Sequence, residues 1–135
     1  MDRLDSFIKE SQRLNPLSLV AFERKAKATL TLTDGTSVPK GSFIAAPAYH
    51  VGIDPEIYEM PAEFDGLRFC KLRSKDQTGE RGSKFRYDAP SEAHLHFGLG
   101  RHACPGRFLA GLLTKLVLGY VALNYDIPLP HPNKG

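Results

Sequence analysis

The sequence predicts a mainly α-helical fold with a small β-sheet, of the α+β class. Three observations support this: an amphipathic helix near the start, a strand–turn–strand pattern over residues 28–47, and a long apolar helix near the end. With 135 residues, 41% of them hydrophobic, the chain has the size of one ordinary domain. No internal repeat or linker divides it, so we expect a single domain over residues 1–135.

The first expected helix covers residues 4–14, LDSFIKESQRL. Its apolar side chains recur at helical spacing, and we expect Asp5 or Ser6 near its start. The helix is expected to end at Asn15-Pro16, because the residue before a proline disfavours the helical conformation.

Residues 28–47, ATLTLTDGTSVPKGSFIAAP, predict two strands joined by a turn. Leu30 and Leu32 alternate with threonines, and the pair Asp34-Gly35 is typical of a tight turn. This hairpin is the expected source of the small sheet.

The middle of the chain is expected to be mostly loop. Residues 54–66 are rich in turn-forming residues, with room for one short helix at most. Residues 70–92 are polar, charged and interrupted by glycine, which predicts a surface loop. The six basic residues from Lys71 to Arg86 are mixed with acids and have little aromatic interleaving, so they indicate a solvated loop rather than a binding patch.

The last helix is expected to begin at Pro105, because the first turn of a helix accepts proline. Apolar side chains cover almost its whole circumference between Phe108 and Leu123, and such a helix needs burial on most faces. The other expected elements offer little surface against which to bury it.

Composition excludes several classes of function. The chain has 18 basic and 15 acidic residues, and a net charge of +3 is too weak to indicate nucleic-acid binding. Cys70 and Cys104 form no disulfide framework, and the polar start is not a signal peptide. The apolar run Phe108–Leu123 contains Thr114 and Lys115 and is shorter than the about 20 residues of a membrane span. We therefore expect an intracellular, cytoplasmic chain without a membrane span, kept in a reducing environment.

Cys104 lies where chemistry is expected. It precedes the apolar helix, and unpaired N–H groups and the helix dipole at such a position favour a thiolate, the form that ligates metals. Glycines around it permit a flat partner to approach, and cationic or donor side chains nearby suit carboxylates. The glycines are Gly98, Gly100 and Gly106, and the donors are Arg101, His102 and Arg107. Together these features suit a haem with a cysteine axial ligand.

Three other interpretations of the corner are possible. Cys104 could be a structural cysteine, which is the common case. It could be a nucleophile, although none of the histidines at 94, 96 and 102 has an identifiable third partner. Residues 98–103 also match the G-x-G-x-x-A dinucleotide pattern, with Asp126 placed as its acidic residue. That pattern requires a helix through Pro105 and Gly106, which would break it, so we reject the dinucleotide site.

Residues 97–106, FGLGRHACPG, resemble the haem-binding loop of cytochrome P450, the haem-thiolate monooxygenases, with every constrained position filled. HACPGRFLA is similar to fungal members that act in secondary metabolism. The resemblance implies haem as cofactor, Cys104 as axial ligand of its iron, and His102 as a donor to a haem propionate, with Arg24 as a second candidate donor. The remaining implied haem-binding residues are Phe97, Gly98, Gly100 and Gly106.

The resemblance extends upstream. Glu10 and Arg13 match the family's E-x-x-R, and PAEFDGLRF, residues 61–69, is similar to the segment that supplies a second arginine, here Arg68. Gly66 stands where the family commonly has proline. The resemblance implies a buried charged trio of Glu10, Arg13 and Arg68, and burial is tolerable only if all three are paired.

The implied activity is insertion of one oxygen atom from O2 into an organic substrate, in secondary-metabolite biosynthesis, with no catalytic residue identifiable in this chain. The implied partners are a small-molecule substrate and a flavoprotein reductase, which Arg101, Arg107 or Lys115 would help to recruit. The chain corresponds only to the C-terminal part of the family fold: proximal helix, small sheet, haem-binding loop and final helix, a single partial domain.

The shortness of the chain leaves two alternatives open. We expect weak or absent hydroxylase activity from the chain alone, because the family's substrate-recognition and oxygen-activating helices have no counterpart in it. The alternatives are a non-catalytic accessory or remnant protein, and a fragment of a longer gene product.

Overall fold

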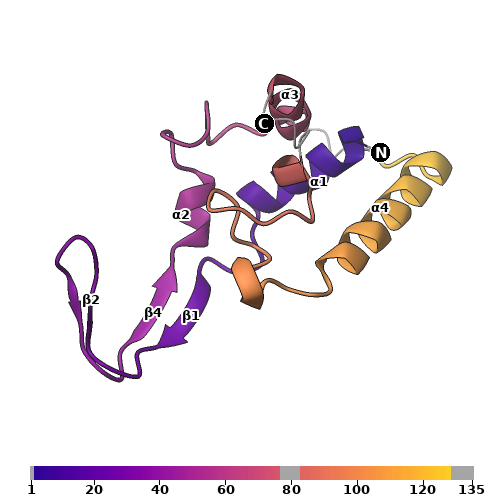
Figure 1. Ribbon diagram of the computed structural model, residues 1–135. Helices are drawn as coiled ribbons and strands as arrows, with labels where there is room; N and C mark the ends of the chain where they lie inside the picture. The colour runs from indigo at the N-terminus through magenta and orange to yellow at the C-terminus, as the bar shows by residue number, and fades with distance from the viewer. Residues whose placement is uncertain (1, 77–82, 129–135) are drawn as a thin grey trace, which may run out of the picture.

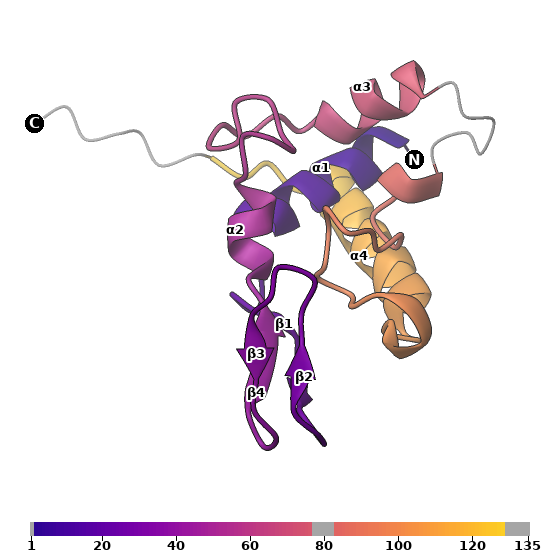
Figure 2. The same cartoon turned by 60° about the vertical axis from the view of Figure 1, so that its left-hand side comes forward.

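A computed structural model describes residues 2–76 and 83–128 of the chain. In this part, four α-helices accompany two short antiparallel sheets, so the predicted α+β class is confirmed. The first helix, α1, lies at the centre of the helical part, and the strands form an arm that extends away from it (Figures 1 and 2).

Helix α1 spans Asp2–Leu14. Asp5 lies in its first turn and Ser6 directly after it, near the start of the helix as predicted, and both side chains are buried. The end is as predicted, with the Asn15 amide donating to the Ser11 carbonyl (2.9 Å) before Pro16. Charged and polar side chains fill the buried face of α1, which an apolar pattern alone does not reveal.

The predicted hairpin is present, and residues 28–47 contain three strands where two were expected. β2 (Leu30–Thr31) pairs with β3 (Ser37–Val38) around the Asp34-Gly35 turn, where Gly35 has a φ of 87°. β4 (Phe43–Ala46) pairs instead with β1 (Ala21–Lys25), a strand that the sequence did not predict. β1 has only two half-buried residues followed by three exposed ones, so it shows no alternating pattern.

The middle of the chain differs from the prediction. A short helix, α2 (Ala48–Gly52), precedes residues 54–66, which contain turns and no helix. Helix α3 covers Arg68–Lys75, so the prediction of a loop from residue 70 was wrong for residues 70–75. Only Arg68 and Phe69 of α3 are buried, and a helix with so few buried residues has little apolar periodicity to detect.

Two short 3₁₀ turns, η1 (Ser83–Phe85) and η2 (Gly100–His102), precede the last helix, α4, which spans Arg107–Asn124. Gly106 is its N-cap, so the helix begins two residues after the predicted Pro105. At 18 residues, α4 is long and apolar enough, by length and composition alone, to cross a membrane. The expectation of no membrane span is therefore weakened.

The core around α1 is unusual in composition. Its buried apolar residues come from several elements: Ile8, Ala26, Ala48, Tyr58, Phe69, Tyr87 and Leu95. Among the described residues, eight polar and charged residues are buried, against these seven apolar ones: Asp5, Ser6, Lys9, Glu10, Arg13, Arg68, Asp88 and His94. Buried charge is tolerated only when it is paired, so hydrogen bonds to α1 decide how the surrounding segments are held.

Candidate functional site: a cysteine loop and a buried charged trio

The loop before α4 is held by its own backbone. The Cys104 amide donates to the Phe97 carbonyl (2.8 Å), and the Ala103 amide donates to the Gly100 carbonyl (3.0 Å). These bonds close residues 97–104 into a compact turn. Cys104 is exposed and free, so its thiol is available to a ligand.

Each glycine of the loop has its own physical reason. Gly98 has a φ of 71°, and a Cβ there would lie 3.2 Å from the His102 carbonyl oxygen, so the turn itself requires glycine. Gly100 has a φ of 64°, and a Cβ there would meet nothing within 4 Å. A Cβ on Gly106 would lie 3.9 Å from the Cys104 sulfur. The last two glycines therefore leave open space beside the loop and beside the thiol.

The predicted donors differ in their contacts with the cysteine loop. His102 is exposed in η2, where its Nε2 accepts a hydrogen bond from Arg101 Nε (3.3 Å). Arg107 donates to the Cys104 carbonyl (2.9 Å) and lies over the Phe108 ring. Arg24 lies in β1 and donates to the Glu23 carbonyl (2.8 Å). Among the described contacts none joins Arg24 to the loop.

The residues present fit a haem. The donor set offers one exposed thiol as an iron ligand, and the missing Cβ atoms of Gly100 and Gly106 leave room for a flat macrocycle to approach. His102 and Arg101 supply exposed donors on the same loop. The geometry does not favour a cysteine nucleophile, because in the described part of the chain no histidine hydrogen-bonds to Cys104.

Between α1 and α3, the structure brings Glu10, Arg13 and Arg68 together. The Glu10 carboxylate accepts from Arg13 Nε (2.8 Å) and NH2 (2.7 Å), and from Arg68 Nε (3.0 Å). Glu10 and Arg13 are fully buried. Burial opposes the charge on Glu10, but the hydrogen bonds from Arg13, the Asp65 amide and Arg68 outweigh it and lower the pKa of Glu10.

The two arginines also bind backbone carbonyls at the end of α2 and in the turn-rich segment. Arg13 donates to Gly52, Pro61 and Glu63, and Arg68 donates to Glu59, Met60 and Glu63. The trio thereby organises a segment that has no regular structure of its own. Removing one member of such a network leaves a buried charge unpaired, which typically costs about 3–5 kcal/mol.

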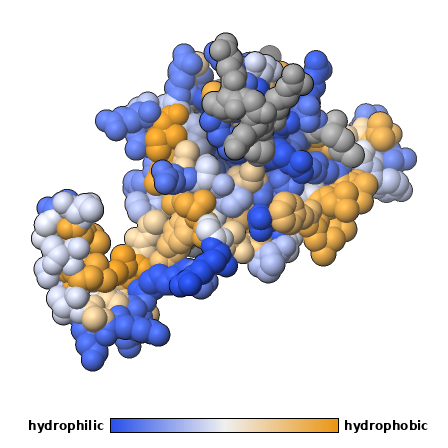
Figure 3. All heavy atoms as spheres, in the orientation of Figure 1, coloured by the Kyte–Doolittle hydropathy of each residue, from blue (hydrophilic) through white to orange (hydrophobic). Residues whose placement is uncertain are grey.

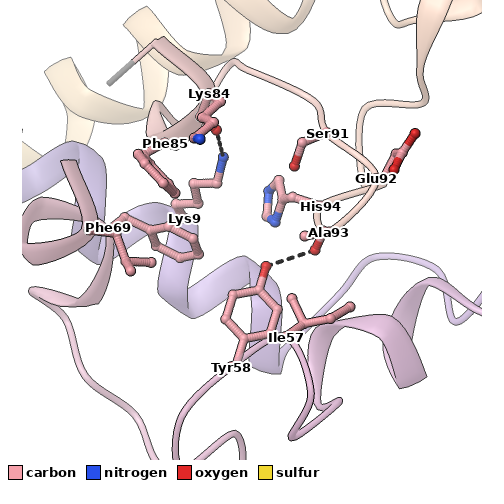
Figure 4. A pocket seen from close by; sticks show the side chains of 11 residues that line it. Lys9, Ile57, Tyr58, Phe69, Lys84, Phe85, Ser91, Glu92, Ala93 and His94 are labelled. Atoms are coloured by element: carbon pink, nitrogen blue, oxygen red, sulfur yellow. Dashed lines mark hydrogen bonds between the residues drawn. The ribbon is translucent and has the colours of Figure 1, made fainter. Parts of the chain in front are cut away.

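A cavity of about 470 Å³ opens between α1, α3 and residues 91–94 (Figure 4). Two of its polar groups have partners within the protein: Lys9 Nζ binds three carbonyls, and the Tyr58 hydroxyl donates to the Ala93 carbonyl (2.7 Å). His94 Nδ1 has no partner, but it is itself shielded from solvent. Bonds within the protein therefore already take up the donors of Lys9 and Tyr58, and no ligand role is assigned to this cavity.

Sequence reasoning missed Lys9, Tyr87 and the role of Asp5. Lys9 and Asp5 are four residues apart on α1, and they face the same side of the helix. This spacing is the only signal the sequence carries, and it is common on solvent-exposed helices. Burial of both charges, which distinguishes this pair, is visible only in the structure.

Comparison with known proteins agrees with this geometry. The profile described as Cytochrome P450 matches residues 1–134. Cytochrome P450 monooxygenase BOA4 of Botryotinia fuckeliana is 47% identical over 127 residues, which cover 94% of this chain and 25% of that protein. Cytochrome P450 monooxygenase ltmK of Epichloe festucae is 43% identical over 134 residues, 98% of this chain and 25% of that protein.

The fold shows the same likeness. A solved zebrafish cytochrome P450, in a structure with progesterone, superposes with a TM-score of 0.73 at 24% identity, over 96% of this chain and 26% of that one. The chain thus spans about a quarter of the length of the relatives it matches. With a family match along nearly its whole length, the chain belongs to the cytochrome P450 family of haem-dependent oxidoreductases.

Proposed function

We propose that this chain forms the haem-thiolate part of a monooxygenase that inserts one oxygen atom from O2 into a small organic substrate of secondary metabolism. The observation that carries the proposal is the exposed Cys104 thiol on a loop closed by the Cys104–Phe97 hydrogen bond. The Gly100 and Gly106 positions, open to a flat ligand, support it. We further propose that residues 1–135 form one partial domain.

In this proposal each residue of the loop has a defined task. Cys104 supplies the thiolate that ligates the iron, and its backbone bond to Phe97 fixes where the sulfur lies. His102 binds a propionate, and Arg24 remains a candidate for the same role. Bound haem would supply oxygen activation and the storage of electrons. No residue of the described part is assigned to substrate binding or to proton delivery.

A flavoprotein reductase is the proposed electron donor. Of the three basic residues expected to recruit it, Arg101 is exposed and remains suitable. Lys115 is not free for this role, because its amine donates to Asp5 (2.8 Å) and its side chain is only 14% exposed. An intracellular location, expected from the reduced cysteines, is also part of the proposal.

Haem loading of the purified chain tests the proposal. We expect reduced, haem-loaded chain to give the thiolate-type spectrum with carbon monoxide. Cys104→Ala should abolish this spectrum, because the chain then has no sulfur on the loop. The matched control is Cys70→Ala, which removes the other free cysteine and should leave the spectrum intact.

A thiolate-type spectrum that persists in Cys104→Ala would overturn the ligand assignment. Wild-type chain that takes up no haem would favour the alternative of a non-catalytic protein.

A further inference from the structure

A second buried charge network lies on α1, beside the trio. Lys9 is 1% exposed, and its amine donates to the carbonyls of Lys84 (3.1 Å), Arg86 (2.7 Å) and Ala89 (3.1 Å). An ammonium has three donors, and each has one acceptor here. Lys9 thus fixes the path of residues 84–89, a segment with no strand or α-helix of its own.

Asp5, one turn earlier on the same face, holds the same segment and α4 at once. Its Oδ2 accepts from the Tyr87 amide (2.8 Å), and its Oδ1 accepts from Lys115 of α4 (2.8 Å). Burial opposes the charge on Asp5, but the bonds from Lys115 and the Tyr87 amide outweigh it and lower the pKa of Asp5. One carboxylate therefore ties together the segments on both sides of the cysteine loop.

Tyr87 carries this constraint toward the cysteine. Its ring is buried and meets the Phe97 ring edge-on, with centroids 5.3 Å apart. On another side it packs on Gly111 of α4, where a Cβ would lie 3.3 Å from Tyr87 Cδ1. Phe97 in turn accepts the Cys104 amide hydrogen bond. The contacts run without a gap from Asp5 through Tyr87 and Phe97 to Cys104.

We propose that Tyr87, held in place by Asp5 and Lys9, is a positioning residue for Cys104. The Tyr87 ring fixes Phe97, and the Phe97 carbonyl fixes the backbone of the cysteine. As a statement about an iron ligand this rests on the proposed function, whereas the coupling between Tyr87 and the Cys104 backbone does not.

A positioning role and a merely stabilising role predict different changes in hydrogen exchange at individual amides. Loss of general stability raises hydrogen exchange by one common factor at all amides that exchange only through global opening of the chain. Loss of positioning raises exchange at Cys104 and leaves α1 unchanged. Arg13, fully buried in α1, provides the reference amide.

The experiment compares hydrogen exchange of individual amides in the full haem-free chain by NMR. In Tyr87→Leu, which keeps an apolar side chain but removes the ring, exchange at Cys104 should rise about tenfold and exchange at Arg13 at most a few-fold. Tyr87→Phe, which keeps the ring, should match the wild type. If Tyr87→Leu does not fold, Tyr87→Met takes its place, because it keeps more of the side-chain volume.

The proposal would be overturned if Tyr87→Leu raised hydrogen exchange at Cys104 and Arg13 by the same factor, or if it left exchange at Cys104 unchanged. A parallel measurement on haem-loaded chain records the fraction of carbon monoxide adduct with the thiolate-type spectrum, which should fall in Tyr87→Leu and not in Tyr87→Phe. A wild-type chain that binds no haem defeats the proposed function alone, because the exchange comparison is made without haem.

Discussion

His94 is a buried histidine that the fold keeps neutral. Its side chain is 2% exposed, and its Nε2 lies 3.2 Å from Gln12 Oε1, where it can donate. Burial, and then the charges of Lys9, His96 and Arg13, lower the pKa of His94 well below 6.5. Burial likewise lowers the pKa of His96 to about 4. Both rings are therefore uncharged near neutral pH.

These two histidines predict a loss of stability in mild acid. The unfolded chain takes up protons on them near pH 6.5, whereas the folded chain does so only at lower pH. The part of the stability that depends on these neutral rings is therefore fully present above pH 6.5, and it is lost as the pH falls toward 4. His94→Gln keeps a side-chain N–H donor for the Gln12 amide oxygen. This substitution should lower the slope of the free energy of unfolding against pH by about 1.4 kcal/mol per pH unit.

Urea unfolding at several pH values across this window measures the slope. His50→Gln, which changes an exposed histidine, is the control and should keep the wild-type slope. An unchanged slope in His94→Gln would show that His94 is not buried as a neutral ring.

At the scale of elements, α4 contacts the buried core through a glycine. Gly111 is its only buried residue among those described, and it lies against the Tyr87 ring. Lys115, four residues later on the same face, donates to Asp5. The helix is thus attached to the core by one close approach and one buried ion pair.

Two glycines of α4 should respond to substitution in opposite directions. Gly111→Leu places a side chain where Tyr87 lies, and such overpacking should lower the free energy of unfolding by about 1–3 kcal/mol. Gly119→Ala meets nothing within 4 Å, and the gain in helix propensity should raise this free energy by about 0.5–1 kcal/mol. Urea unfolding followed by circular dichroism measures both free energies. An unchanged free energy of unfolding in Gly111→Leu would show that α4 does not pack against Tyr87 at this position.

For the whole molecule, the prominent feature is the apolar surface of α4. Eight of its large apolar residues are more than half exposed, and Figure 3 shows a hydrophobic area where α4 lies. They are Phe108, Leu109, Leu112, Leu113, Leu116, Val117, Tyr120 and Leu123. A contiguous apolar patch of this kind on a protein surface marks an interaction site or a tendency to aggregate.

The purified chain should therefore self-associate in a concentration-dependent manner. Leu112→Glu/Leu116→Glu places two charges on this face and should shift sedimentation toward the monomer, because burying them on association is costly. Leu17→Glu/Leu19→Glu, at two exposed leucines outside α4, is the matched control and should leave association unchanged. A wild-type chain that is monomeric at all concentrations would contradict this prediction.

How much the sequence predicted depended on how local each signal was. The α1 helix, the Asp34-Gly35 turn and the long final helix follow from spacing and turn chemistry within a few residues. β1 and α3 were missed because few of their residues are buried and they show no apolar periodicity. Such elements form because neighbours pair with them or cover them.

The sequence by itself determined the family and the identity of the cysteine loop, because the residues of FGLGRHACPG are constrained by their own backbone and lie next to one another. Only the tertiary structure decided which charges are buried and what they hold. Lys9 binds carbonyls at positions 84, 86 and 89, and Asp5 binds the amide of Tyr87. The energy of a buried charge depends on partners distant in the chain, and residue spacing along α1 contains no record of them.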